Sequence, residues 1–190
     1  MMTALSALIT AMFQCRTTWA MNFYEHSHHW WRALMRFLIL GMTYCLVASS
    51  MTAFLAPRAA GSGLPEIKGF LNGSKIKGLW QLRVFVVKFF AIALAIGAGL
   101  PVGREGPAVF LGASLAHALW RHGHRIWHGG LLWHGHQARD AEHKRLYATI
   151  GGAAGIASAF GAPIGGVLYV FEEISSYWDE RKTVLACVEI

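Results

Sequence analysis

Three breaks of glycine followed by proline interrupt the apolar sequence and limit what this chain can fold into. They lie at residues 61–65 (GSGLP), 103–107 (GREGP) and 160–163 (FGAP). Proline suits the first turn of a helix, so each break predicts a helix start. One such break is most often an ordinary turn, but three beside apolar sequence predict helices that begin inside the protein.

The composition indicates a membrane protein. Hydrophobic residues make up 55% of the 190 residues and charged residues only 14%, a balance typical of integral membrane proteins. A chain of this length supplies about four or five membrane segments of about 20 residues. We therefore predict an all-α integral membrane fold, a multi-pass bundle of tilted, broken and re-entrant helices. Residues 1–190 would form a single partial membrane domain.

The apolar pattern predicts where these helices lie. The apolar run at 79–102 contains Lys88, and an ionisable residue inside a membrane segment is by default functional or paired, although a lysine on a tilted helix also reaches the surface by snorkelling. Five glycines of the last apolar stretch, at 151, 155, 161, 165 and 166, favour close helix contacts. The expected segments are spans at 33–57 and 79–102, a re-entrant helix at 65–72, a short helix at 107–120, a polar loop at 121–145 and two helices within 147–175.

Charge and cysteine content exclude several classes of function. The net charge of +7 is concentrated outside the apolar runs, so it predicts loop charge and argues against nucleic acid as a partner. Basic residues beside spans favour the cytoplasmic side for residues 121–145. The three cysteines are scattered, which argues against a disulfide framework or a zinc site. No pattern of an enzyme active site is present.

Histidines form two H-x-H pairs in the predicted polar loop. The pairs are His122 with His124 and His134 with His136. Such pairs bind metal when a third ligand completes the site, and no third ligand stands at a fixed spacing. A solvated loop is therefore preferred and no metal is assigned. A His-rich membrane protein that binds metal or haem remains an open alternative.

Glu105 is the most informative single residue. It lies between two glycines at a predicted helix start, at the end of an apolar run. An ionisable residue at such a place is costly and indicates a function. The N–H groups and dipole of a helix start attract anions. A carboxylate there would compete with a permeant anion.

Four sequence strings resemble the CLC family of chloride channels and chloride/proton exchangers. They are GSGLPEIKGFLNG (61–73), RVFVVKFF (83–90), GREGPAVFLGASLA (103–116) and GIASAFGAPIGGVLYVFEE (155–173). The resemblance extends over about residues 33–173. It implies a homodimer at full length, each subunit with its own pore built from two inverted repeats. Only about the first repeat is present, so we expect a fragment or incomplete gene product without a complete pore.

The resemblance implies roles for residues near the first two breaks. Ser62 resembles the serine that coordinates chloride, together with neighbouring backbone N–H groups, for which Gly63 and Gly106 are the candidates. The alternative for Ser62, a cap on the following helix, is compatible with coordination. Glu105 resembles the gating glutamate, which occupies an anion site when ionised and swings away when protonated. A salt bridge with Arg104, here a supporting residue, is the alternative.

The resemblance also implies roles for Glu173, Glu172 and Lys88. Glu173 resembles the internal proton-transfer glutamate of the exchangers, and its alternative is a solvated helix end. Glu172 resembles a structural companion, and Lys88 a source of positive potential for the anion. We therefore predict chloride/proton antiport; a passive voltage-gated chloride channel is the alternative. No cofactor is expected, and the partners are chloride, protons and the lipid bilayer. The membrane itself stays open between endosome, lysosome, vacuole and cell surface.

Overall fold

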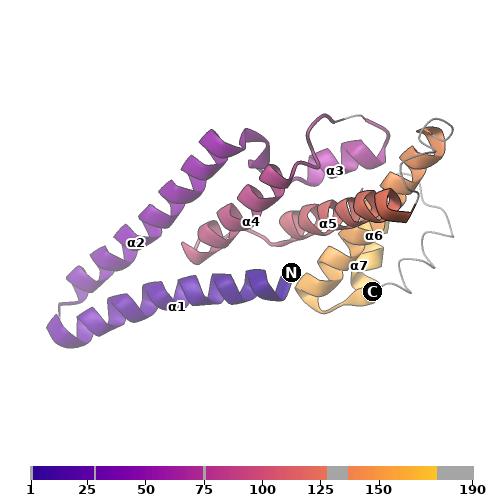
Figure 1. Ribbon diagram of the computed structural model, residues 1–190. Helices are drawn as coiled ribbons and strands as arrows, with labels where there is room; N and C mark the ends of the chain where they lie inside the picture. Colours follow the sequence, from indigo (N-terminus) through magenta and orange to yellow (C-terminus); the bar gives the residue numbers. More distant parts are fainter. Residues whose placement is uncertain (1, 28, 75, 128–136, 175–190) are drawn as a thin grey trace. The chain divides into compact units, whose positions relative to one another are not determined.

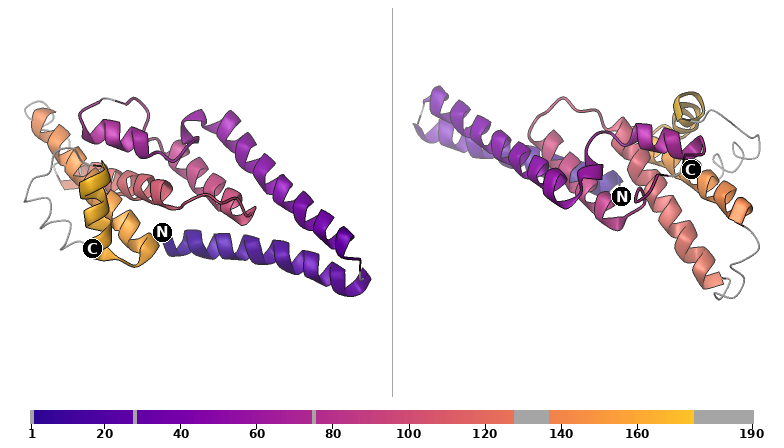
Figure 2. Two further views of the ribbon diagram at one scale, coloured as in Figure 1. Left: turned by 180° about the vertical axis from the view of Figure 1, so that it is seen from behind. Right: turned by 90° about the horizontal axis from the view of Figure 1, so that it is seen from above.

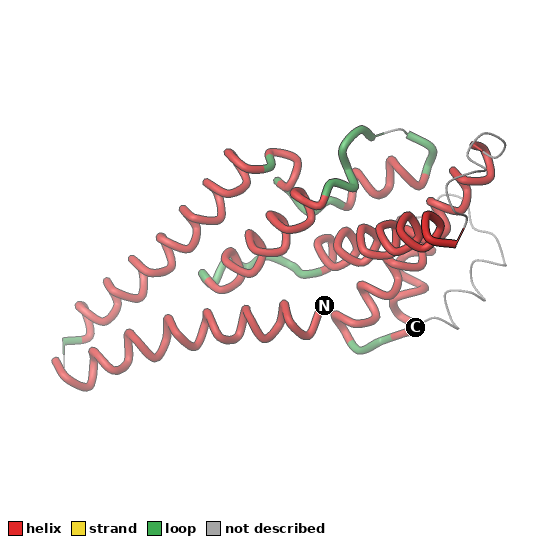
Figure 3. Tube along the Cα trace, in the orientation of Figure 1, coloured by secondary structure: helices red, strands yellow, loops and turns green. Residues whose placement is uncertain are grey.

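The computed structural model describes residues 2–27, 29–74, 76–127 and 137–174 (Figure 1). Helices are the regular elements in these ranges, where no strand occurs (Figure 3). This agrees with the predicted all-α class. The α-helices are α1 (Met2–Ser27), α2 (Trp30–Ser50), α3 (Leu64–Leu71), α4 (Leu82–Gly97), α5 (Glu105–Trp127), α6 (Gln137–Phe160) and α7 (Pro163–Tyr169). Short π-helical turns, η1 (Met51–Leu55) and η3 (Val170–Ile174), continue α2 and α7, and η2 (Pro57–Ala59) is a 3-10 turn.

The described residues form two compact units. The first contains the chain up to Ala60 together with Val86–Gly103, so it holds α1, α2 and most of α4. The second contains Gly61–Phe85 and the described residues from Arg104 onward, so it holds α3, α5, α6 and α7. The expectation of a single membrane domain stays a prediction. All residues of the candidate site except Lys88 belong to the second unit.

In the first unit, α1 and α2 form a hairpin (Figure 2). Arg36 of α2 places its guanidinium over the Phe23 ring of α1 at 3.4 Å and near the Trp19 ring at 5.2 Å. Cation–π contacts of this kind become stronger when the arginine is partly desolvated. Arg36 therefore joins the two helices.

A second arginine connects α1 to the turn after α4. Arg16 is only 5% exposed. Its guanidinium lies 3.8 Å from the centre of the Phe37 ring and donates a hydrogen bond to the Ala98 carbonyl. The last carbonyls of a helix lack partners within the helix and carry partial negative charge, which a cation satisfies. Arg16 thus caps the C-terminal end of α4.

One described helix is long and apolar enough to cross a membrane by length and composition, Trp30–Leu55 with a mean hydropathy of 1.8. It corresponds to the span predicted at 33–57. The second predicted span, 79–102, is wrong in length because α4 has 16 residues and ends at Gly97. Gly99 adopts a left-handed φ of +83° just before Pro101, and this backbone turns the chain away from the helical path.

Small residues bring α5 and α6 into backbone contact. Gly112 of α5 faces α6, and a Cβ atom added to it would overlap the Gly151 carbonyl and lie 3.0 Å from the Gly155 Cα. A Cβ on Gly155 would overlap the Ala108 carbonyl in the same way. Helices approach this closely only where side chains are absent or small. The crossing therefore fixes α5 against α6.

The predicted break at 160–163 does divide the last apolar stretch into two helices. Gly161 turns the chain with a φ of +66°, and α7 starts at Pro163. Gly166 then packs on α6, since a Cβ there would lie 2.5 Å from the Ala153 carbonyl oxygen. Gly165, in contrast, would meet only the Ala162 Cβ at 3.3 Å. Of the five glycines expected to pack, 151, 155 and 166 do so and 161 and 165 do not.

Aromatic side chains hold α3 against α5. The Trp80 ring, in the loop before α4, stacks on the His117 imidazole of α5 with centroids 4.4 Å apart and planes at 9°. Phe70 of α3 meets the Trp80 ring edge to face at 4.9 Å. His117 is 8% exposed, so the cluster is largely buried. Aromatic pairs of this geometry add stability beyond that of the apolar area they bury. They therefore hold α3, the helix that follows the break at 61–65, against α5.

The predicted polar loop at 121–145 is too long at both ends. The helix predicted at 107–120 begins at Glu105 and continues to Trp127, and α6 starts already at Gln137. The polar residues at both ends of the predicted loop include good helix formers. Their polarity therefore indicates that they are exposed, but it does not indicate a loop. His122 and His124 therefore lie on α5, while His134 and His136 lie outside the described residues. No group of three potential metal ligands gathers in the described ranges.

We predict that Gly112→Ala destabilises the protein by about 1–3 kcal/mol, the usual cost of overpacking. The added methyl group meets the backbone of α6, which cannot rotate aside as a side chain can. The measurement is the thermal stability of the purified protein in detergent. Gly165→Ala is the matched control: it adds the same methyl group at an exposed position of α7 and should leave stability unchanged or slightly raised. Equal effects of the two variants would contradict the packing account.

Candidate functional site

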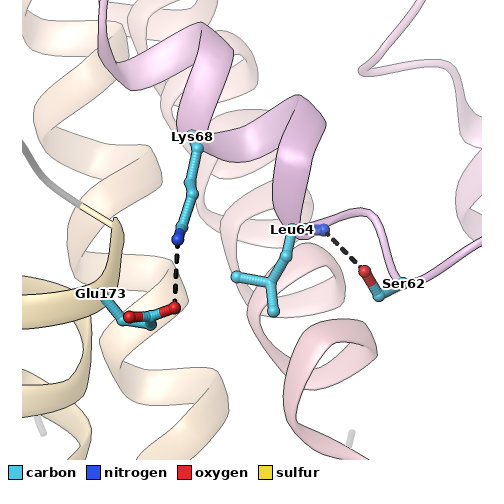
Figure 4. Close-up of polar contacts among 4 residues, drawn as sticks. All are labelled: Ser62, Leu64, Lys68 and Glu173. Carbon is cyan, nitrogen blue, oxygen red and sulfur yellow. Dashed lines mark hydrogen bonds and ion pairs between the residues drawn. The ribbon is translucent and has the colours of Figure 1, made fainter.

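The start of α3 is a tight turn around Ser62. Gly61 and Gly63, on either side of it, adopt left-handed φ angles of +76° and +84°. The Leu64 N–H donates a hydrogen bond of 3.3 Å to the Ser62 hydroxyl oxygen (Figure 4). The hydroxyl thus accepts from the first N–H of α3, although the N-cap position is Gly63 and carries no side-chain cap. A hydroxyl that accepts one hydrogen bond still has its own O–H to donate, so Ser62 keeps a donor for an anion.

The start of α5 supplies the carboxylate. Glu105 is the first residue of the helix and is exposed, Gly106 is the second and is buried. The Ala108 N–H donates to the Arg104 carbonyl at 2.9 Å and closes the first turn. Helix geometry leaves the N–H groups of Glu105 and Gly106 without an acceptor inside α5. Glu105 thus stands where a helix attracts negative charge.

The two helix starts touch each other. A Cβ atom placed on Gly106 would lie 2.6 Å from the Ser62 Cβ and 3.3 Å from both the Ser62 Oγ and the Leu64 Cδ1. Only glycine fits this position. The structure therefore brings Ser62, Gly63 and Gly106 together beside Glu105. The third helix start, that of α7, takes no part in this contact. A Cβ atom added to Gly161, just before α7, would meet nothing within 4 Å.

One turn further along α3, a lysine pairs with the second glutamate, Glu173. The Lys68 Nζ lies 3.1 Å from the Glu173 Oε1, and the two side chains are 40% and 56% exposed (Figure 4). Glu173 belongs to η3, the turn that continues α7, and its neighbour Glu172 is also exposed. Glu173 is thus exposed at a helix end, as the alternative expected, and it is also paired with a cation from another helix.

The supporting residues lie in different surroundings. Lys88 is 1% exposed in α4, in the first unit, so it does not reach the surface by snorkelling. Arg104 is exposed, and the ion pair found among the described residues joins Lys68 to Glu173 and not Arg104 to Glu105.

Two residues near the glutamates escape the sequence reasoning. Lys68 lies within the recognised string at 61–73, but nothing in its spacing shows that it meets a residue 105 positions later. Tyr169 of α7 lies within electrostatic reach of both Glu105 and Glu173. Its position one helical turn before Glu173 is the signal that would have drawn attention to it.

An all-helical fold in which two helix starts touch next to a glutamate is compatible with a membrane protein that binds anions. The family model described as "Voltage gated chloride channel" matches residues 44–189. The chain therefore belongs to the voltage-gated chloride channel, or CLC, family. Multi-pass insertion in a membrane follows from this membership.

Curated relatives and solved structures agree with this placement. The chain is 38% identical over 165 residues to "Chloride channel protein A" of Dictyostelium discoideum, covering 83% of this chain and 19% of that protein. It is 38% identical over 151 residues to "H(+)/Cl(-) exchange transporter 7" of Homo sapiens, covering 80% and 19%. A crystal structure of a eukaryotic CLC transporter matches with a TM-score of 0.81 and 29% identity, over 98% of this chain and 33% of that one.

A second solved structure, a slow cyanobacterial Cl-/H+ antiporter, matches with a TM-score of 0.72 and 27% identity, over 97% of this chain and 40% of that one. The chain thus spans about a fifth of the length of the curated relatives and between a third and two-fifths of the solved structures. These matches place the two touching helix starts inside a known transporter fold.

We predict that Gly106→Ala weakens chloride binding about tenfold or more in the native-length protein. The methyl group would displace Ser62, and a lost hydrogen bond to a charged ligand costs about 1.5–3 kcal/mol. Chloride affinity is measured by isothermal titration calorimetry. Gly103→Ala is the control, because a Cβ there meets no atom within 4 Å. Unchanged affinity in Gly106→Ala would show that Ser62 does not contact the ion.

Proposed function

We propose that the protein moves chloride across a membrane in exchange for protons. The observation that carries the proposal is the contact of Ser62 with the second residue of α5, directly beside Glu105. It brings a hydroxyl donor and two helix starts together, and the residue before Gly106 in the sequence carries a titratable carboxylate. The printed names of two similar proteins, an H(+)/Cl(-) exchange transporter and a Cl-/H+ antiporter, support the choice of ions.

Chloride would bind where α3 and α5 begin. Ser62 would donate its hydroxyl hydrogen, and backbone N–H groups at Gly63 and Gly106 would complete the site. Helix starts favour anions through their unpaired N–H groups and the helix dipole. A site of this kind binds chloride loosely enough to release it, which transport requires.

Glu105 would act as the gate. Its ionised carboxylate carries the same charge as chloride and is attracted to the same helix start, so the two compete for one place. Protonation removes the charge and with it the attraction. The carboxyl group then leaves the site and chloride enters. Arg104 would support this arrangement through the carbonyl that closes the first turn of α5.

Glu173 would carry protons to and from the cytosolic side, with Glu172 as its structural neighbour. A carboxylate accepts a proton from water and passes it on without any bound cofactor. Lys88, buried in α4, would add positive potential to the anion path. The presence of Glu173 favours exchange over a passive channel, which is the second candidate and is supported by the name of the relative "Chloride channel protein A".

We also propose that the full-length protein is a homodimer in a membrane, either an intracellular one or the plasma membrane. Exposed apolar residues of α7 and η3, Ile164, Leu168 and Phe171, are 75%, 51% and 45% exposed and suit a partner subunit or lipid. Cross-linking in native membranes tests the dimer, and imaging of the tagged protein against the cell surface tests the location.

We predict that Glu173→Ala abolishes proton movement while chloride movement continues, because only the proton carrier is removed. Glu105→Gln should likewise stop proton exchange and leave chloride movement independent of pH, because a neutral amide mimics the protonated gate. Both ion fluxes are measured in proteoliposomes that contain the native-length protein.

The wild-type protein provides the reference: a chloride gradient should drive protons uphill. If it does not, the passive channel is the correct assignment. If Glu173→Ala still moves protons at the wild-type rate, the role of Glu173 is disproved.

A further inference from the structure

Helix α3 has a contact with each of the two proposed ion pathways. At its first residue, the Leu64 N–H binds the Ser62 hydroxyl, next to the start of α5. Four residues later, Lys68 pairs with Glu173 of η3 at 3.1 Å. Residues four apart lie on one face of a helix, about 6 Å apart along its axis. One helical turn therefore separates Leu64, which binds the Ser62 hydroxyl, from Lys68, which binds Glu173 (Figure 4).

The Lys68–Glu173 ion pair depends on the charge of the carboxylate. An ionised carboxylate attracts the ammonium group, whereas a protonated one does not. With 40% and 56% of the side chains exposed, water screens the pair, so it can open and close during a transport cycle. The pair thus joins α3 to η3 in one protonation state of Glu173 and releases it in the other.

The surroundings of Glu173 make Lys68 its cation from α3. Glu66, also on α3, and Glu172, beside Glu173, are acidic, and Tyr169 on α7 is neutral when protonated. The part of α6 that faces η3 is apolar: Gly152 lies against Val170, and residues 147–160 contain no charged side chain. A proton that arrives at Glu173 therefore changes the contact with α3 and leaves the contact with α6 unaltered.

We propose that Lys68 is a positioning residue that couples proton loading of Glu173 to the chloride site through α3. With Glu173 ionised, the ion pair holds α3 and keeps Ser62 against the start of α5. When Glu173 takes up a proton from water, the ammonium group of Lys68 is released and α3 is free to shift, which alters how Ser62 meets the anion. The proposal rests on the proposed function, and it adds a residue and a route to it.

The test compares Lys68→Gln with Lys68→Arg in the native-length protein in proteoliposomes. Lys68→Gln should lower the number of protons moved per chloride by about fivefold or more, the lower end of typical coupling between two sites, while chloride flux stays within about twofold. Lys68→Arg keeps the cation and should restore coupling. Lys144→Gln is the matched control, because Lys144 lies over the Trp120 ring, 5.2 Å from its centre, and should retain wild-type coupling.

A second measurement starts from the charge of Glu173. Glu173→Gln removes the charge of the carboxylate, so its chloride affinity, measured by calorimetry, should differ several-fold from the wild type. The double variant Lys68→Gln/Glu173→Gln should have the same affinity as Glu173→Gln alone, because the pair is already broken.

The outcomes separate this inference from the function on which it rests. If Glu173→Ala keeps proton coupling, the proposed function fails. If Glu173→Ala loses coupling but Lys68→Gln keeps it, or if Glu173→Gln binds chloride as the wild type does, only the role of Lys68 is overturned. A loss of coupling in Lys144→Gln equal to that in Lys68→Gln also overturns it, since any change of charge would then suffice.

Discussion

The missing side chain at Gly106 is the constraint on which the candidate site depends. A Cβ atom there would lie 2.6 Å from the Ser62 Cβ, so only glycine lets the start of α3 approach the start of α5. The same principle holds α5 against α6, where Gly112 meets the backbone of Gly151 and Gly155. Helices in membrane proteins gain little from hydrophobic contact with each other and rely on such close packing. The lack of a side chain at Gly106 therefore allows the start of α3, with Ser62, to contact the start of α5.

Much of this arrangement follows from sequence. Glycine followed by proline marked the starts of α3, α5 and α7, because these residues have narrow backbone preferences that act locally. The recognised strings also named Ser62, Glu105 and Glu173 before any geometry was known. The touching of Ser62 and Gly106 was expected only in the general sense that helix starts converge, and the structure places two of the three starts together.

Other features could not be predicted, because they depend on contacts between distant residues. The ion pair of Lys68 with Glu173 joins positions far apart in the chain, and no local pattern encodes it. The length of α4 was overestimated since hydropathy does not register the left-handed backbone of Gly99. The polar residues around 121–145 suggested a loop, although polarity on a helix indicates only that its surface is wet.

The contact between Arg16 and Ala98 has a practical meaning for anyone who shortens this protein. Helix α1 ends at Ser27, before the family match begins at residue 44, so boundaries drawn from the match alone would discard it. The Ala98 carbonyl would then lose its donor and the Phe37 ring its cation. Because Ala98 follows the last residue of α4, that loss would loosen the C-terminal end of this helix. Helix α1, which lies outside the family match, therefore helps to hold α4 in place.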